Sequence, residues 1–307
     1  MSFSNFLDPK NDLAFKRVFG SDRNKDIIIH FLNDIFAGQI SPVKQIRFLK
    51  TIQEPEVASQ RVSIVDIMCE AVDGDRFIVE MQVLHEPGFE KRAQFYAARA
   101  YIDQRQTGVE YKDLKQVIFL AITDFIVFPN KPDYLSHHYV LDIKTYERDL
   151  KDFSFSFLEL PKFKKEIDEL DTMIEKWTYF FQNAQRTTER ELEEIAGDDL
   201  IIKRAYEELN RFSWNHGELL NYDSVDMKIC ADRAILHGAR TMGVEEGRKE
   251  GMKIGREEGK LEGKLEGKLE GKLEAKIEMA RALLQKKYKI ETVAEITSLS
   301  LRQIEEL

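Results

Sequence analysis

Residues 63–83 have the sequence SIVDIMCEAVDGDRFIVEMQV, and this stretch decides the fold. The triplet Asp73-Gly74-Asp75 is typical of a tight turn, so the flanking segments are predicted to form the two strands of a β-hairpin. Each of the two strands carries apolar side chains on both of its faces. Strands of this kind are buried on both sides, in a sheet that helices cover. The stretch therefore predicts an α/β fold with this hairpin near its centre.

Three polar residues, Asp66, Glu80 and Gln82, interrupt the apolar hairpin. A buried carboxylate is costly unless a cation or a set of hydrogen bonds compensates its charge. Glu80 and Gln82 share a face because strand side chains alternate. With a three-residue loop at 73–75, Asp66 lies opposite Gln82 and all three side chains converge, whereas a two-residue loop turns Asp66 to the other face. The carboxylates predict a metal site; alternatively, they neutralise cations such as Arg61.

The pattern D-x13-E-x-Q on paired strands resembles the core motif of the PD-(D/E)XK nucleases, with Gln82 at the position where lysine is usual. The surrounding sequence resembles one branch of them, the recombination-promoting nuclease or putative transposase family. The similarity spans roughly residues 8–185. Its matching segments are NDLAFKRVFG at 11–20, RVSIVDIMCE at 61–70, FIVEMQ at 77–82, KRAQFYAARAY at 91–101 and IEKWTYFFQNA at 174–184.

This resemblance implies a restriction-endonuclease-like αβββαβ core and a magnesium-dependent DNA endonuclease that promotes DNA cleavage and recombination. Asp66 and Glu80 are then ligands of Mg²⁺ or another divalent cation such as Mn²⁺. Gln82 is the third catalytic residue. Two alternatives stay open. The chain is a catalytically weak or inactive DNA-binding accessory protein of recombination, or it is an oligomeric scaffold.

Basic residues near the motif are candidates for DNA contacts. Lys16 lies one helical turn after Asp12 in a predicted helix, so the two form an ion pair or serve DNA or metal. A second predicted helix spans residues 89–106, and there Arg92, Tyr96 and Arg99 are candidates for contacts with substrate phosphate. Ordinary surface charge is the alternative for these side chains. The apolar side chains that we expect this helix to turn inward are Phe95, Ala98, Tyr101 and Ile102.

The remaining sequence suggests four segments. Residues 1–185 form the nuclease-like domain, in which KQVIFLAI at 115–122 is a central strand and residues 153–160 alternate like an edge strand. A helical subdomain at 186–242 follows, then a repeat helix at 243–279 and a small helical tail at 280–307. The chain thus carries a C-terminal helical extension.

Glycine recurs at every fourth position from Gly243 to Gly271. Each glycine costs about 1 kcal/mol in a helix interior relative to alanine. The lysine, leucine and glutamate residues between the glycines favour helix nonetheless. A second helix would gain close backbone approach at the glycines, with lysine rows facing glutamate rows. We therefore expect a repeat helix that forms a homodimer, and a semi-flexible tether is the alternative.

Composition bounds the function further. The formal net charge is −9, so overall charge does not favour DNA binding, and any phosphate-binding surface must come from local clustering. Cys69 and Cys230 are the only cysteines, which excludes a disulfide framework. No apolar run reaches membrane-spanning length, and the first residues lack the pattern of a signal peptide. We expect a cytoplasmic protein with no membrane partner.

Overall fold

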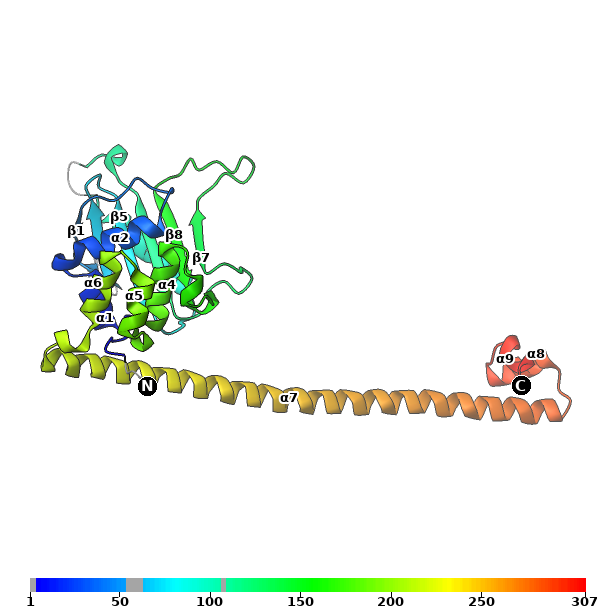
Figure 1. Cartoon of the computed structure of the whole chain (residues 1–307). Coiled ribbons are helices and arrows are strands. Elements are labelled where there is room, and N and C mark those ends of the chain that lie inside the picture. The colour runs from blue at the N-terminus through cyan, green and yellow to red at the C-terminus, as the bar shows by residue number, and fades with distance from the viewer. Residues whose placement is uncertain (1–3, 54–62, 106–108) are drawn as a thin grey trace. The chain divides into compact units, whose positions relative to one another are not determined.

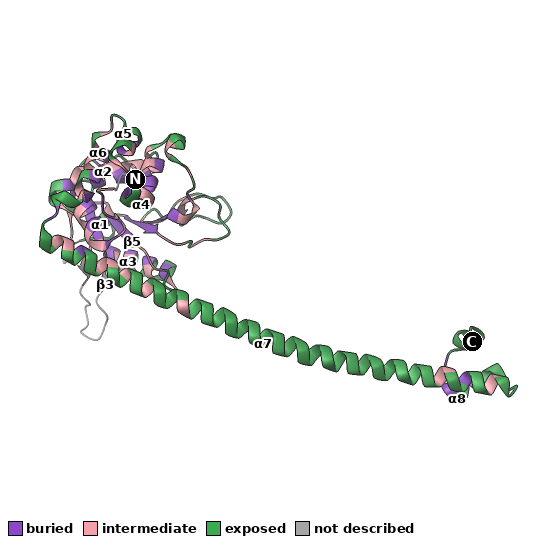
Figure 2. Ribbon diagram, turned by 60° about the horizontal axis from the view of Figure 1, so that its bottom comes forward, coloured by how far each residue is buried: buried purple, intermediate pink, exposed green. Residues whose placement is uncertain are grey.

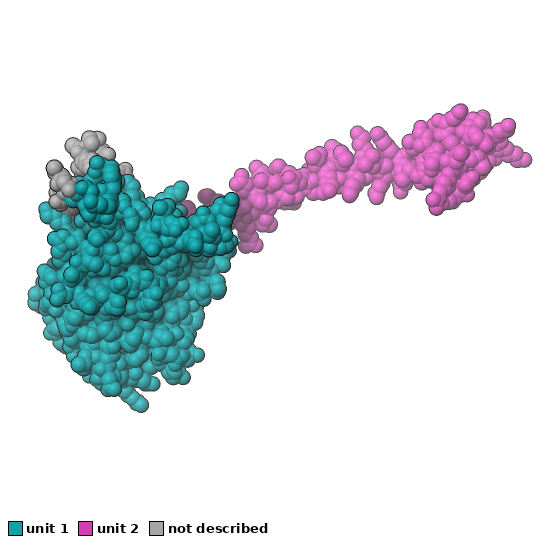
Figure 3. Space-filling model, turned by 90° about the horizontal axis from the view of Figure 1, so that it is seen from above, with its two compact units in different colours: residues 1–233 teal, residues 234–307 magenta. Residues whose placement is uncertain are grey.

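The computed structural model describes residues 4–53, 63–105 and 109–307. The chain divides into two compact units, residues 1–233 and 234–307, which are coloured separately in Figure 3. The boundary that we expected at 185–186 falls inside the first unit. The two units are described separately below.

A six-stranded mixed sheet is the centre of the first unit (Figure 1). Its strand order is β1-β4-β5-β6-β8-β7. Strand β5 is parallel to β6 and β6 to β8, while the other neighbours are antiparallel. The strands are β1 (Ile46–Phe48), β4 (Ile67–Ala71), β5 (Arg76–Gln82), β6 (Val117–Thr123), β7 (Leu135–Tyr139) and β8 (Phe153–Glu159); β2 (Ile52–Gln53) and β3 (Ser63–Ile64) form a separate pair.

The predicted central strand is confirmed, because every residue of β6 is buried between β5 and β8. The edge position expected for residues 153–160 is wrong. Strand β7 pairs with the outer side of β8 and is itself the edge of the sheet. The alternation along β8 therefore does not mark a strand that lacks a neighbour.

The predicted hairpin forms, but its turn lies one residue earlier than expected. Ile67 pairs with Val79, and the main-chain NH of Ala71 donates to the carbonyl oxygen of Asp75 at 2.9 Å. The loop is thus 72–74, and the register extended by one residue brings Asp66 beside Glu80 rather than opposite Gln82. Gly74 has a φ of +94°, and a Cβ there would lie 2.8 Å from the side chain of Lys115. Glycine is needed at this turn for both reasons.

Helices cover the two faces of the sheet unequally. One face and its large core are covered by α1 (Asp12–Phe19), α2 (Lys25–Ile35), α4 (Met173–Asn183), α5 (Glu189–Ala196) and α6 (Leu200–Leu209). The other face packs against α3 (Phe89–Ile102). Helices α5 and α6 contribute to the same core as α1 and α2. The hairpin is therefore covered on both sides, as its apolar faces predicted.

The face that α3 turns toward the sheet differs from the expected one. Its buried side chains are Phe89, Ala93, Ala97 and Ala100, and the small alanines allow the helix to lie close to the strands. Phe95 and Ile102 are more than half exposed, so their expected inward position is wrong.

Helix α7 (His216–Gln285) contains the whole glycine repeat, which confirms the predicted helix. Residues 239–275 are exposed, as the green ribbon of Figure 2 shows. Among the described residues, no atom outside the local helix backbone lies within 4 Å of a Cβ added to any glycine of the repeat.

The end of α7 packs with α8 (Ile290–Thr297) and α9 (Leu301–Glu305) around a small core of its own, formed by Ala280, Val293, Leu299 and Ile304. Within the described residues, no helix has both the length and the apolar character needed to cross a membrane.

Candidate active site

The backbone bends at Asp66, between β3 and β4. Val65 is buried in the core on the α3 side, whereas Ile67 is buried in the core on the opposite side. In a regular strand these two side chains, two positions apart, would share one face. The change of face therefore takes place at Asp66, which lies outside the regular pairing of β4 with β5.

Side chains complete the hydrogen bonding at this bend. The main-chain NH of Asp66 donates to Oε1 of Glu80 at 3.0 Å, and the NH of Met81 donates to Oδ2 of Asp66 at 2.9 Å. Glu80 is 2% exposed. The structure thus brings together the two acidic residues that the sequence singled out, on neighbouring strands.

Gln82 lies on the same side as Glu80 and contacts it. Its Nε2 donates to Oε2 of Glu80 at 3.1 Å, while its Oε1 accepts from Nη2 of Arg92 at 2.7 Å. Arg92 comes from the first turn of α3 and also forms an ion pair with Glu86. The guanidinium therefore orients the amide so that its NH₂ group faces Glu80. Glu86 is a member of this network that the sequence did not indicate, because only the position of α3 brings it to Arg92.

A second cation approaches the carboxylates from α1. Nζ of Lys16 lies 2.7 Å from Oδ1 of Asp12, which confirms the predicted ion pair. The same Nζ lies 3.8 Å from Oδ1 of Asp66. Burial lowers the pKa of Lys16, but the hydrogen bond that Lys16 donates to Asp12 and the charges of Asp12, Asp66 and Glu80 raise it by more. Lys16 is thus held in its charged form beside Asp66.

Both carboxylates hold protons unusually strongly. Burial, followed by the negative charge of Asp66, raises the pKa of Glu80 to about 8. Burial also raises the pKa of Asp66 to about 6, with a further increase from Asp12 that the NH of Met81 and Lys16 oppose. A shift in this direction means that the neighbouring cations do not fully compensate the pair. Such a site favours a further positive charge.

The donor set fits a hard divalent cation. Mg²⁺ prefers oxygen ligands, and proteins commonly bind it through one or two carboxylates while water and substrate phosphate fill the other positions. Asp66 and Glu80 supply such carboxylates. No group of three or more His, Cys, Asp or Glu residues suited to a metal occurs among the described residues. A cation here would therefore depend on water and substrate for most of its coordination.

The other DNA-contact candidates lie on α3. Tyr96 follows Arg92 by one turn; burial raises its pKa, as do Glu80, Glu86 and Asp66, against the opposing effect of Arg92. Tyr96 is thus within the electrostatic reach of the carboxylates. Arg99 lies a further turn along, half-buried in the last turn of α3. The structure gathers Lys16, Arg92 and Tyr96 around the acidic pair.

Comparison with known proteins bears on the family of the chain. The family model described as PD-(D/E)XK nuclease family transposase matches residues 9–238. No curated protein and no solved structure gave a match. The matched segment holds all seven candidate residues and covers well over half of the chain, so the chain belongs to the PD-(D/E)XK nuclease family transposases.

Proposed function

We propose that this protein is a divalent-metal-dependent DNA endonuclease that cleaves phosphodiester bonds during recombination. The observation that carries the proposal is the contact between Asp66 and Glu80, two buried carboxylates with raised pKa values on adjacent strands. The order α2, β1, β4, β5, α3, β6 supports an αβββαβ core around them. DNA is the substrate that the nuclease family implies.

In this proposal Asp66 and Glu80 hold the cation, with Mg²⁺ or Mn²⁺ as the natural ions. When bound, the ion polarises the scissile phosphate and lowers the pKa of the attacking water. The protein contributes position and charge. Asp66 is fixed by the NH of Met81, and Glu80 accepts hydrogen bonds from Asp66 and Gln82. Each carboxylate oxygen has a further lone pair, so these bonds are compatible with metal ligation.

Gln82 cannot supply the positive charge that lysine brings at its position in related nucleases. Arg92 brings one nearby, since its Nη2 lies 2.7 Å from Oε1 of Gln82. The Arg92 side chain is partly exposed, so an oxygen of the substrate phosphate can approach its guanidinium. We therefore assign Arg92 to the phosphate and Gln82 to orienting the water or the phosphate by hydrogen bonds.

Plasmid nicking tests the proposal directly. Wild-type protein is expected to relax supercoiled DNA with Mg²⁺ or Mn²⁺ and to stop when EDTA is added. Asp66→Asn should lower the rate by at least about 100-fold, because a ligand charge is lost while the acceptor for Met81 remains. Asp75→Asn is the matched control, since it removes a partly buried carboxylate from the turn region of the same hairpin.

Undiminished nicking by Asp66→Asn would refute the site. The amide at position 82 favours one alternative, a DNA-binding accessory protein with little catalysis. That alternative predicts that wild-type protein binds DNA and leaves it intact under all of these metal conditions.

A further inference from the structure

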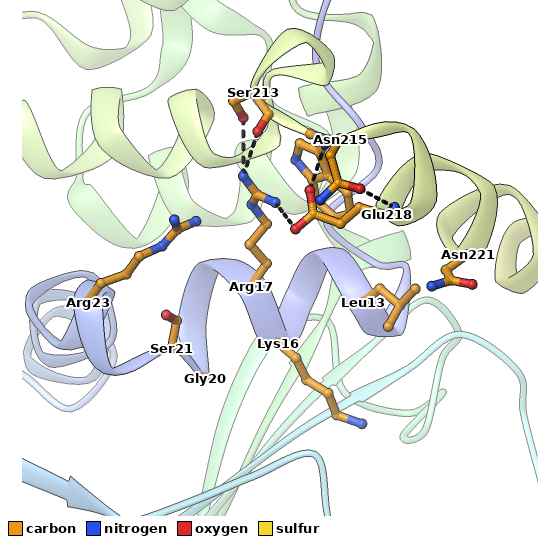
Figure 4. Close-up of a pocket in the computed structure, with 11 residues that line it drawn as sticks. Leu13, Lys16, Arg17, Gly20, Ser21, Arg23, Ser213, Asn215, Glu218 and Asn221 are labelled. Carbon is orange, nitrogen blue, oxygen red and sulfur yellow. Dashed lines mark hydrogen bonds and ion pairs between the residues drawn. The ribbon is translucent and has the colours of Figure 1, made fainter.

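An open groove of about 750 Å³ lies between α1 and the start of α7, within the first unit (Figure 4). One side is formed by α1, from which Lys16 and Arg17 line the groove. The other side is formed by residues that lead into α7 and by its first turns, including Asn215 and Asn221. Arg23 also lines the groove. Of the residues that line this groove, Lys16 alone also belongs to the candidate active site.

Arg17 is held rigidly in this groove. Its guanidinium carbon lies 4.4 Å from the centre of the Trp214 ring, a cation–π contact. Nη2 donates to the carbonyl oxygen of Ser213 at 3.1 Å. Ion pairs with Glu208 and Glu218, at 3.3 and 3.1 Å, complete its contacts. Arg17 thus gives the groove a fixed wall rather than a mobile surface charge.

The charged side chains that line the groove are mostly positive. They are Lys16, Arg17 and Arg23, against the single carboxylate of Glu218. Outside the lining, Glu208 pairs with Arg17 and Arg23, and Asp12 pairs with Lys16. The other polar lining groups include the side-chain amides of Asn215 and Asn221. In a chain with a net charge of −9, a concave surface of this composition stands out as a place for a polar anion.

Lys16 joins this groove to the carboxylates. It lines the groove, and its Nζ lies 3.8 Å from Oδ1 of Asp66. In Figure 4 the Lys16 side chain leaves α1 on the side of the strands, whereas Arg17 points toward Ser213 and Glu218. A polymer of phosphates that reaches Asp66 can therefore continue past Lys16 toward Arg17 and Arg23 of the groove.

We propose that the groove binds a short single-stranded segment of DNA that continues from the scissile phosphate. The size supports one strand, since pockets of about 300–1,000 Å³ take small ligands and a duplex needs a far broader surface. Single strands are commonly bound by positively charged grooves that follow the backbone. The inference rests on the proposed function for the location of the scissile phosphate. The preferred substrate is then DNA with an unpaired flank, such as an overhang or a branch.

Binding without cleavage tests the groove separately. Fluorescence anisotropy in EDTA would compare a labelled oligothymidylate with a blunt duplex of equal length. Arg23→Ala removes one groove cation, and Asn221→Asp adds a negative charge while it leaves the cations and their ion pairs in place. Lys112→Ala is the matched control, because Lys112 is also an exposed cation paired with a carboxylate, in the segment that precedes β6.

Both groove variants should weaken binding of the single strand by about fivefold and leave duplex binding unchanged. Arg23→Ala should also reduce the slope of log affinity against log salt by about 0.7, the contribution of one phosphate on a single strand. Circular dichroism and melting confirm that each variant is folded. Lys112→Ala should bind as wild type does.

Three results would overturn the inference. Unchanged binding by Asn221→Asp and Arg23→Ala would exclude the groove. An equal loss on the duplex would mean that the groove follows duplex DNA. Tighter binding of oligouridylate than of oligothymidylate would make RNA the ligand. Failure of the proposed nuclease has a different signature, which is intact single-strand binding together with absence of cleavage.

Discussion

The main-chain NH of Asp66 donates to the side chain of Glu80, so one proposed metal ligand fixes the backbone of the other. At Asp66 the main-chain NH therefore finds a side-chain carboxylate as its acceptor, where a regular strand pair would offer a carbonyl oxygen. Any substitution at either residue must be judged for its effect on the strand as well as on the charge.

Glu80→Gln should flatten the pH dependence of stability in the metal-free protein. The folded-state pKa of Glu80 is about 8, above its ordinary value of 4.5. The folded protein then binds more protons than the unfolded chain between these values, so stability falls as pH rises through this window. Glutamine cannot ionise and should melt higher than wild type near pH 8. Melting scans in EDTA from pH 5 to about 9 measure this. Identical slopes for the two proteins would contradict the raised pKa.

Mg²⁺ should stabilise the wild-type protein more at high pH than at low pH. Metal ligation requires ionised carboxylates, so the cation competes with the protons on Asp66 and Glu80. The increase in melting temperature at a fixed Mg²⁺ concentration should grow between pH 6 and about 8. Glu80→Gln should lose most of the increase at every pH. An increase that is independent of pH would place the bound cation elsewhere.

Gln82→Lys should retain or raise the cleavage activity. Lysine restores a positive charge beside Glu80, where it can stabilise charge that develops on the phosphate. It also gives up the contact between Gln82 and Arg92. Gln82→Met is the control of similar length without charge or hydrogen bonds, and we expect it to be impaired. Loss of activity in Gln82→Lys with intact fold and metal binding would show that the amide has a role that lysine cannot fill.

Arg92→Lys should lower the nicking rate by about tenfold, although it preserves the charge. A guanidinium can bind Gln82, Glu86 and a phosphate oxygen at once through its planar fork, which an ammonium cannot reproduce. Lys91→Ala changes the neighbouring exposed cation on α3 and should have little effect. Rates measured at saturating DNA separate a loss in catalysis from a loss in binding. Equal effects of the two substitutions would reduce Arg92 to general surface charge.

Replacement of repeat glycines by alanine tests the expected self-association. Alanine at Gly255, Gly259, Gly263 and Gly267 should stabilise the helix by about 1 kcal/mol per site, because no atom of the described residues obstructs the added methyl. A glycine-lined pair of helices would in turn associate less tightly, since the methyl prevents close approach. Circular dichroism and sedimentation report the two effects. Wild-type protein that is already monomeric at micromolar concentration would make the repeat a tether. If the repeat instead forms a glycine-lined helix pair, deletion of residues 243–307 should convert a dimer to a monomer whose core stays folded.

The hairpin and the acidic pair were predictable because local alternation and the rarity of buried carboxylates are visible in the sequence. The exact turn was not, since the signal around Asp73 fits loops at 72–74 and 73–75 equally. In the observed loop, a Cβ at position 74 would lie 2.8 Å from the side chain of Lys115, a residue distant in sequence. The prediction of which face of α3 is buried was wrong for a related reason. Large apolar residues suggested one face, while close packing on the sheet selects the alanines at 93, 97 and 100.

The exposed repeat in α7 has a practical consequence for work on this protein. Lys260, Lys264, Lys268 and Lys272 are all exposed on a helix that glycine weakens at every fourth residue. Local opening of such a helix presents a trypsin cleavage site in each repeat unit. Brief digestion should therefore trim the chain to a set of products separated by four residues, all retaining the compact first unit.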